Sequence, residues 1–188
     1  MNQIAFSEIL LNFKKQPNFT RENAMDIFWE ELTYGLPDRN QLVHLIIRLT
    51  GAILLGAVIG IQRESKNKPA GLRTHILVTL GTTVFIVACN SFGMSSDGLS
   101  RVIQGIVTGI GFIGAGSILK SNEGRSVRGL TTSASVWMAA AIGVAVGLGA
   151  LGVAILTTFA TLIVLMLAGK IEFQIDEAKD ASNEKEDE

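Results

Sequence analysis

One glycine-rich stretch has the spacing of a nucleotide-binding loop. Gly109, Gly111 and Gly114 match the pattern G-x-G-x-x-G, whose backbone amides approach a pyrophosphate in dinucleotide-binding folds. That chemistry requires a preceding strand, a helix that begins at the glycines and an acidic side chain about 20 residues further on. Here the glycines lie inside an apolar run, and the Lys that a phosphate-binding loop requires after its last glycine is missing. The pattern therefore indicates glycines used for packing between helices and not a nucleotide site.

The other reactive residue types do not form a catalytic or metal-binding pattern. The sequence has no G-x-S-x-G motif, and its two histidines, His44 and His75, lie near opposite ends of the apolar segments described below. The single cysteine, Cys89, excludes an internal disulfide and a cysteine-based metal cluster. We therefore expect no enzyme activity, no cofactor and no resident metal.

Acidic residues are too few for a dedicated magnesium path through one subunit. Mg²⁺ is held by carboxylates and waters in octahedral geometry. Between residues 42 and 169 the only acids are Glu64, Asp97 and Glu123, and the predicted topology places them on two opposite sides of a membrane. The formal net charge of −1 likewise gives no field that would attract nucleic acid.

Polar side chains gather near the ends of the apolar segments. On the side predicted to be outside lie Arg48, Asp97, Arg101 and Gln104, and on the inner side lie Arg63, Glu64, Arg73, Thr74, His75, Arg128, Thr131 and Thr132. A charge inside a span is costly unless it pairs, so we expect Asp97 to pair with Arg48 or Arg101. Glu64 is expected to pair with Arg73 or Arg128. These residues either lock helices together or take part in function, and both interpretations stay open.

The elements that position these residues are predicted to be membrane helices. The chain has 188 residues, of which 48% are hydrophobic but only 6% aromatic, and 20 are glycines. Richness in small residues is typical of helices that pack in lipid. Five segments are each close to the ~20 residues that a bilayer core requires, and they cover residues 42–61, 74–92, 102–119, 130–148 and 150–168. The predicted fold class is an all-α membrane protein of about five transmembrane helices.

Charges in the loops predict the orientation. The loops that follow the first and third spans carry Arg63, Arg73, Lys120 and Arg128, whereas the other two loops are nearly free of cations. Basic loops prefer the cytoplasm, so the N-terminus is expected outside and the C-terminus inside. Residues 1–41 form either an amphipathic interfacial helix or a flexible extension, with apolar residues from Ile4 to Phe13 and from Ile27 to Leu36 on common faces. Residues 42–169 form the membrane domain, and residues 170–188 an acidic, disordered cytoplasmic tail.

Small residues recur at helical spacing along several of the spans. They are expected to mediate helix packing, either within one chain or between copies, and they comprise Gly56, Gly60, Gly105, Gly109, Gly111, Gly114, Gly116, Ala139, Gly143 and Gly147. A short repeat is also visible, because Gly71-Leu72-Arg73-Thr74 opens the second span and Gly129-Leu130-Thr131-Thr132 opens the fourth. It indicates either two parallel helical hairpins plus a fifth helix, or convergence on one hairpin chemistry.

Several segments together resemble a known family. GAVIGIQRES, KPAGLRTHILVTLG, SRVIQGIVTGIGFIGAGSILK and VRGLTTSASVWMAAAIGVAVGLG occur in this order and resemble the MgtC/SapB family of bacterial membrane proteins over residues 42–168. The resemblance implies a membrane domain of about five helices in the bacterial plasma membrane. MgtC-like members also carry a soluble ACT-like domain after the last span, whereas only residues 170–188 follow it here. The chain is therefore similar to a SapB-like or short MgtC-like member.

The resemblance also implies a role in magnesium homeostasis. MgtC-like members are associated with growth at low magnesium and with survival in phagocytes, and MgtC is described as acting on the F-type ATP synthase. We expect a non-enzymatic regulator that binds another membrane protein, or itself, in adaptation to magnesium limitation or stress. The alternative is an oligomeric transporter of ions or small solutes.

Overall fold

A computed structural model describes residues 21–33, 39–120 and 127–183 of the chain, which divides into two compact units, Met1–Asp38 and Arg39–Glu188. The first unit contains helix α2 (Arg21–Thr33), on which Met25, Phe28 and Trp29 are exposed. The rings of Phe28 and Trp29 meet edge to face with their centroids 6.0 Å apart. The apolar patch expected from Ile4 to Phe13 lies outside the described residues.

The second unit is built from helices joined by short connections. They are α3 (Arg39–Ser65), α4 (Leu72–Ser91), α5 (Ser96–Gly116), α6 (Leu130–Gly147) and α7 (Leu151–Asn183). Strands β1 (Leu119–Lys120) and β2 (Val127–Arg128) form a small antiparallel hairpin between α5 and α6. Helices α3 to α6 are each long and apolar enough to cross a membrane, and residues Leu151–Leu167 of α7 form a shorter apolar segment. The predicted helical membrane fold is confirmed.

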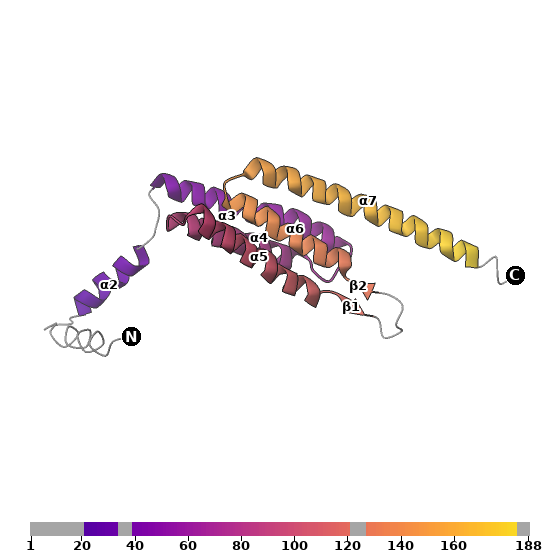
Figure 1. The fold of residues 1–188 in the computed structure, drawn as a ribbon, viewed down its shortest axis with the longest axis horizontal. Helices are drawn as coiled ribbons and strands as arrows, with labels where there is room; N and C mark the ends of the chain where they lie inside the picture. Colours follow the sequence, from indigo (N-terminus) through magenta and orange to yellow (C-terminus); the bar gives the residue numbers. More distant parts are fainter. Residues whose placement is uncertain (1–20, 34–38, 121–126, 184–188) are drawn as a thin grey trace. The chain divides into compact units, whose positions relative to one another are not determined.

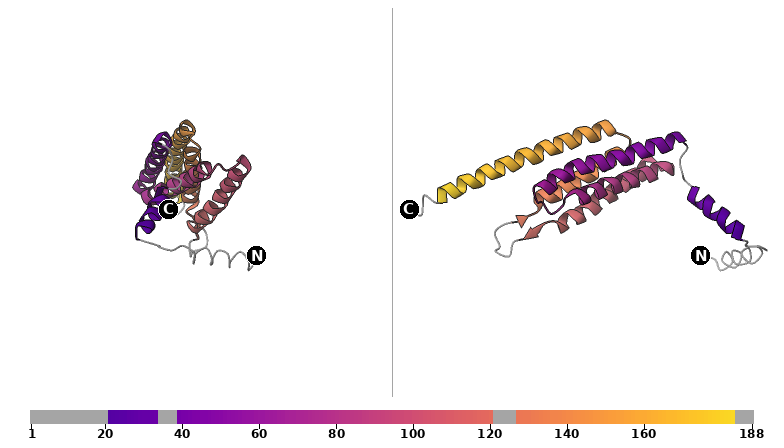
Figure 2. Two further views of the ribbon diagram at one scale, coloured as in Figure 1. Left: turned by 90° about the vertical axis from the view of Figure 1, so that its left-hand side faces the viewer. Right: turned by 180° about the vertical axis from the view of Figure 1, so that it is seen from behind.

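The chain direction reverses from each of these helices to the next. The connection between α3 and α4 lies at the same end of the bundle as the β hairpin, and the turns after α4 and α6 lie at the other end (Figure 1). Helix α4 packs against α3 and α6, and α6 also contacts α5 and α7 (Figure 2). Two central helices, α4 and α6, therefore carry most of the core.

The core is made largely of small and β-branched side chains. Helix α6 buries Val136, Ala139, Ile142 and Val146 inside this bundle. Most large apolar side chains of α3 and of the described part of α7 point outward, which is the arrangement expected where lipid is the solvent. Close approach of backbones, and not a thick layer of large side chains, holds the bundle together.

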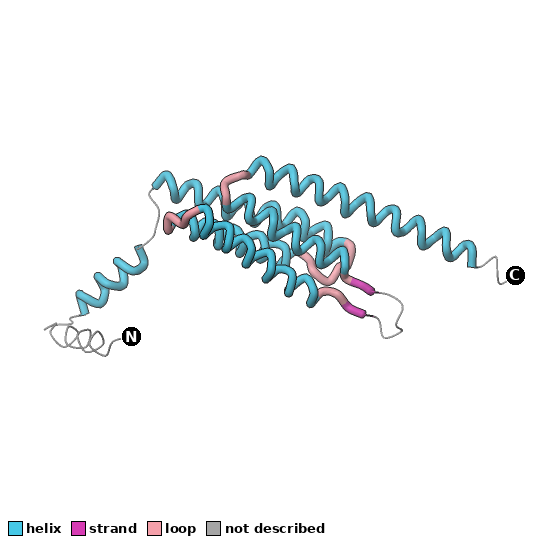
Figure 3. The backbone as a smooth tube through the Cα atoms, viewed as in Figure 1, coloured by secondary structure: helices cyan, strands magenta, loops and turns pink. Residues whose placement is uncertain are grey.

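Two glycines with positive φ set the loops beside α6. Gly129, which precedes α6, has a φ of 95°, and a Cβ placed there would overlap the carbonyl oxygen of Ser117. Gly149 has a φ of 84° in the tight turn from α6 to α7 (Figure 3). Only glycine adopts such backbone angles without strain. The two G-L-x-T motifs take equivalent places, since Gly71 and Gly129 each stand just before a helix.

Several helix limits differ from the sequence prediction, among them the start of α5 at Ser96, which was expected at 102. Helix α3 begins at Arg39, three residues before the predicted span at 42. Helix α7 continues to Asn183, whereas the composition predicts a disordered tail from residue 170. The segment from Lys170 to Asn183 contains no glycine or proline and is rich in Glu, Ala and Lys, so its intrinsic propensity allows the helix to continue. A polar composition indicates a tail outside the membrane but does not exclude a helical one.

Candidate functional site

The small-residue stripes of α3 and α6 both face α4. A Cβ on Gly56 would lie 2.9 Å from the carbonyl oxygen of His75, and one on Gly60 would lie 2.6 Å from the Cα of Leu72. On α6, a Cβ on Gly147 would lie 2.6 Å from the Cβ of Ile86, while one on Gly143 would overlap the Thr79 carbonyl. Ala139 is fully buried on the same helix. These positions are therefore occupied by contacts within the chain, where they let α3 and α6 approach the α4 backbone.

The glycines of α5 behave differently. A Cβ on Gly105, Gly109, Gly111 or Gly116 would meet no atom within 4 Å, whereas one on Gly114 would meet Ser133 of α6. The prediction that the α5 glycines are contact points thus holds within one chain for Gly114 alone. The other four lie on surfaces that the monomer leaves open.

Threonines on α4 form hydrogen bonds to both neighbouring helices. The buried Thr79 hydroxyl lies 2.8 Å from the carbonyl oxygen of Ala52 on α3 and 2.9 Å from that of His75 on its own helix, and its one proton can be donated to either. One turn further, the buried Thr83 hydroxyl donates to the carbonyl oxygen of Gly143 on α6, also at 2.8 Å. Interhelical hydrogen bonds of this kind specify which helix faces meet in a membrane.

A buried polar cluster joins three helices at the end of the bundle near the β hairpin. Arg63 of α3 is 3% exposed and donates from a guanidinium nitrogen to the Thr132 hydroxyl of α6 at 3.1 Å. The fully buried ring of His75 on α4 lies 3.2 Å from the hydroxyl oxygen of Ser135 through Nε2 and 2.8 Å from the Gly71 carbonyl through Nδ1. We call Arg63, His75, Thr132 and Ser135 the inner cluster.

The available donors and acceptors restrict the protonation of His75. A carbonyl can only accept, so Nδ1 must carry a proton and donate to Gly71. The Ser135 hydroxyl has one proton and faces two acceptors, His75 Nε2 and the carbonyl oxygen of Thr132 at 2.8 Å. In neutral His75 this proton points to Nε2. In a protonated ring, Nε2 donates to Ser135 and the hydroxyl turns to Thr132. Hydrogen bonding alone fits either form of the ring, but a second cation in this fully buried site beside Arg63 would be costly.

The opposite end of the bundle is held by Arg48. Its guanidinium donates to the carbonyl oxygen of Gly147, the last residue of α6, at 2.9 Å. Carbonyls at a helix C-terminus have no partner within the helix, and a cation there is favourable. The expected pair with Asp97 is not formed, because a helix end satisfies Arg48 instead. Asp97 and Arg101 are both exposed, and neither makes a side-chain hydrogen bond or ion pair with another described residue.

The other predicted polar residues lie at the surface or its edge. Glu64 accepts a hydrogen bond from the backbone N–H of Leu72 at 2.8 Å, so it caps α4. The expected ion pair between Glu64 and Arg73 is not formed, and the Arg73 side chain is exposed. Thr131 and Gln104 are also exposed and Thr74 is half-buried, while the side chain of Arg128 lies outside the described residues.

Three of the residues that build this core were not predicted as polar contacts, although Ser135 was expected in the small-residue stripe of the fourth span. Thr79, Thr83 and Ser135 make contacts across helices, yet none stood among the candidate polar residues. The spacing His75, Thr79, Thr83 puts three polar groups on one face of an apolar helix, and this signal was available in the sequence. Among the described residues, no group of three His, Cys, Asp or Glu side chains comes close enough to hold a metal ion.

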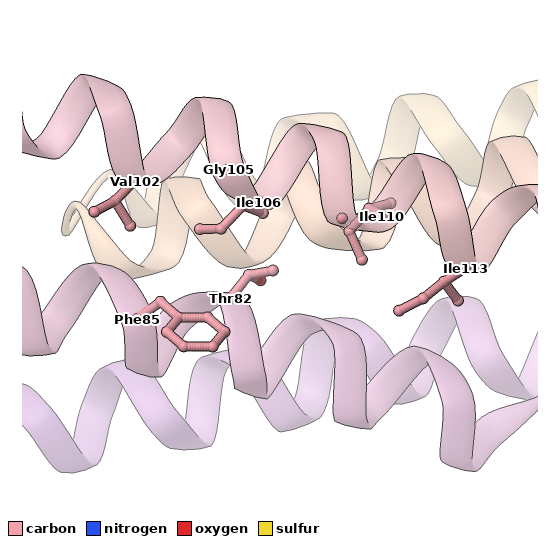
Figure 4. A pocket seen from close by; sticks show the side chains of 8 residues that line it. Thr82, Phe85, Val102, Gly105, Ile106, Ile110 and Ile113 are labelled. Atoms are coloured by element: carbon pink, nitrogen blue, oxygen red, sulfur yellow. The ribbon is translucent and has the colours of Figure 1, made fainter.

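One apolar groove lies between α4 and α5. Its volume is about 370 Å³, and Thr82 and Phe85 line it from α4 while Val102, Ile106 and Ile113 line it from α5 (Figure 4). Gly105 and Gly109 also line the groove on the α5 side. Since these two glycines lack side chains, the groove stays open along α5.

Comparison with known proteins identifies the family of the membrane bundle. Residues 49–174 match the MgtC family. The chain belongs to the MgtC family. The protein SrpB of Synechococcus elongatus is 42% identical over 132 residues, covering 64% of this chain and 72% of that protein. The protein MgtC of Salmonella typhimurium is 46% identical over 114 residues, covering 61% of this chain and 48% of that protein.

A third relative carries a name that refers to magnesium. The Escherichia coli K12 protein YhiD, whose name marks it as a proposed magnesium transporter, is 38% identical over 137 residues, covering 69% of this chain and 63% of YhiD. This MgtC family chain thus spans about half the length of Salmonella MgtC. No solved structure matches it. The matched region contains the inner cluster, Arg63, His75, Thr132 and Ser135, and all of α5.

Proposed function

We propose that this MgtC family chain is a multi-pass protein of the bacterial plasma membrane that regulates another membrane protein by binding it, without catalysis. The setting would be adaptation to magnesium limitation or a related stress. Helices α3 to α6, which are long and apolar enough to span, support multiple passes, and the relatives are bacterial proteins. The basic connections at one end of the bundle support placing that end in the cytoplasm, with the N-terminus outside.

The observation that carries the proposal is the open groove beside α5. Small residues in membrane helices serve close packing of backbones. On α3 and α6 the chain uses them internally, but a Cβ on Gly105 or Gly109 would have no atom within 4 Å, and both glycines line the groove. An apolar groove with a glycine side fits one apolar transmembrane helix of a partner. The F-type ATP synthase, which the family resemblance implies, is the first partner to test.

The glycines at 143 and 147 do not serve this purpose. Their stripe was an expected candidate for partner binding, yet both positions are closed by α4 at distances that leave no room for a Cβ. Replacing either would break the bundle before it affected a partner. The partner surface is therefore assigned to α5, where substitution leaves the chain's own packing intact.

Fill-in variants of the groove test the proposal. Gly105→Leu and Gly109→Leu should both insert and fold, because a Cβ at either position meets no atom within 4 Å and the open groove offers room for the rest of the side chain. Each should abolish recovery of the partner after crosslinking in native membranes and affinity purification. Gly152→Leu on α7 is the matched control, since it too meets no atom within 4 Å but lies outside the groove. Partner recovery that stays unchanged in the groove variants would refute the assignment.

A second candidate function is transport of an ion or small solute, the alternative that the name of YhiD favours. The polar line His75, Thr79 and Thr83 through the bundle is the structural feature in its support. Against it, these hydroxyls are already bonded to backbone carbonyls, and Glu64 and Asp97 lie near opposite ends of the helices. Purified protein in liposomes should move neither Mg²⁺ nor protons under a gradient, and flux that a His75→Leu variant loses would favour the transporter.

A further inference from the structure

Helix α5 turns its most polar face away from the bundle. Asp97, Arg101, Gln104, Thr108, Gly111 and Ala115 are all exposed and recur at alternating spacings of four and three residues. We call these six residues the seam. The opposite side of α5 buries Ile110 and Gly114 against the rest of the chain. The seam is thus one continuous stripe along the helix, with the periodicity of a helix–helix contact.

This polarity is the reverse of what lipid favours. The carboxamide of Gln104 lies where the apolar part of α5 begins, three residues after Arg101, beside hydrocarbon that cannot hydrogen-bond to it. The Thr108 hydroxyl donates to the Gln104 backbone carbonyl at 2.9 Å, so it satisfies itself, but the Gln104 side chain makes no such contact with a described residue. Meanwhile Val102, Ile106 and Ile113 point toward the groove and α4 (Figure 4). In a lone copy this amide would stand at the edge of the lipid without a partner among the described residues.

We propose that the seam pairs with the same seam of a second copy of this chain, side by side and parallel about a two-fold axis along the membrane normal. Copies inserted in one orientation present identical residues at identical depths. Spacings of four and three match the left-handed crossing of about +20° that is common for membrane helices. The proposal does not depend on the proposed partner, because it uses a different side of α5.

The seam is complementary to itself in three ways. A glutamine amide has both donors and an acceptor, so two copies of Gln104 can satisfy each other across the axis. Asp97 and Arg101 lie one turn apart and carry opposite charges, so each can meet its counterpart in the second copy without leaving net charge. Gly111 and Ala115 allow the backbones to approach further along. A partner of another sequence would have to supply this combination by chance.

One large side chain next to the seam also favours a second copy of this chain as the partner. Phe112 is 83% exposed, the highest value among the large apolar side chains that the structure describes. It lies one residue from Gly111, which leaves an open space beside it. In a two-fold pair, Phe112 of each copy can fill the space over Gly111 of the other, as aromatic anchors do at interfaces.

Cysteine scanning along α5 tests the pairing. In a Cys89→Ala background, which removes the only native cysteine, single cysteines would be placed at Thr108, Gly111 and Ala115. Controls at Val107 and Ile113 are exposed but lie off the seam. Mild oxidation in native membranes, with two differently tagged copies co-expressed, should give disulfide dimers that carry both tags at the seam positions, at several times the control yield. Equal yields at all five positions, or crosslinks to a different protein, would overturn the proposal.

Substitution of the central amide gives a second, quantitative readout. Gln104→Leu should raise the dimer dissociation constant in lipid roughly three- to eighteenfold, the range for losing one interhelical hydrogen bond. Val107→Leu should leave it unchanged, and far-UV circular dichroism would establish that both variants fold. A Gln104→Leu variant that dimerises as well as the parent chain would contradict the proposal. The groove variants Gly105→Leu and Gly109→Leu should still dimerise, so failure of the partner hypothesis and failure of this one are distinguishable.

Discussion

Replacing glycine by alanine should have opposite effects on α6 and α5. At Gly143 a Cβ would overlap the Thr79 carbonyl oxygen and the Thr82 hydroxyl oxygen, both closer than the 3.0 Å that real Cβ atoms respect. The hydroxyl can rotate, but the carbonyl belongs to the α4 backbone and cannot. Gly143→Ala must therefore push α4 and α6 apart. At Gly105 the same change meets no atom within 4 Å.

The magnitude follows from three contributions. Overpacking costs about 1–3 kcal/mol, and separation of the helices strains the 2.8 Å hydrogen bond from Thr83 to the Gly143 carbonyl, which is worth roughly 0.6–1.7 kcal/mol. Alanine returns about 1 kcal/mol of helix propensity. The net loss at Gly143 is about 1–4 kcal/mol, whereas Gly105→Ala keeps only the propensity gain of up to ~1 kcal/mol.

Reversible unfolding in mixed micelles measures this difference. The protein would be titrated with SDS in a mild detergent, and helix content would be followed by far-UV circular dichroism. Gly143→Ala should shift the midpoint to lower SDS, and Gly105→Ala should leave it unchanged or raise it. If Gly143→Ala were as stable as the parent chain, the close α4–α6 contact would be wrong. If Gly105→Ala lost as much stability, the α5 face would not be open.

Three further predictions use the same assay. Thr83→Val keeps the shape of the side chain but removes its bond to α6, so it should cost about 0.6–1.7 kcal/mol, while the exposed Thr50→Val should change little; equal effects would deny the cross-helix bond. Arg48→Ala removes a charged donor from the end of α6 and should cost about 1.5–3 kcal/mol, and a neutral result would show that the contact contributes nothing. Glu64→Ala removes the cap of α4 and should cost about 1 kcal/mol, whereas Glu64→Gln, which keeps an acceptor oxygen, should retain most of the stability.

The membrane helices were predictable because their signal is local. Length and apolarity alone placed the ends of α3 to α6 within six residues, and the G-L-x-T motifs marked the starts of α4 and α6. The stripe containing Gly56 and Gly60 was predictable for the same reason, since one helix face can be read from a spacing of four residues. Periodicity shows that a face exists, and for these helices the neighbour happened to be within the chain.

The partners of those faces were not predictable. Nothing in the spacing of Gly105 or Gly109 says that α4 stays clear of them, because this depends on where α6 holds α5. Arg48 was expected to pair with Asp97, but its guanidinium instead donates a hydrogen bond to the carbonyl oxygen of Gly147 at the end of α6, 99 residues away. His75 and Ser135 are 60 residues apart, so only the packing of α4 on α6 brings them together. Pairwise contacts across helices carry no signal that one sequence reveals.

The helices differ in how tightly they are packed, which limits the ones that could move relative to the rest. Helices α3, α4 and α6 are joined by backbone-close packing and by the buried bonds of Arg63, Thr79 and Thr83, so relative motion among them would break several contacts at once. Helix α5 packs mainly on α6, and it carries both an open groove and an exposed seam. A regulator that responds to a partner needs an element whose displacement costs little, and in this bundle α5 meets that condition. The proposed partner in the groove and the proposed second copy at the seam would both contact this helix, on different sides of it.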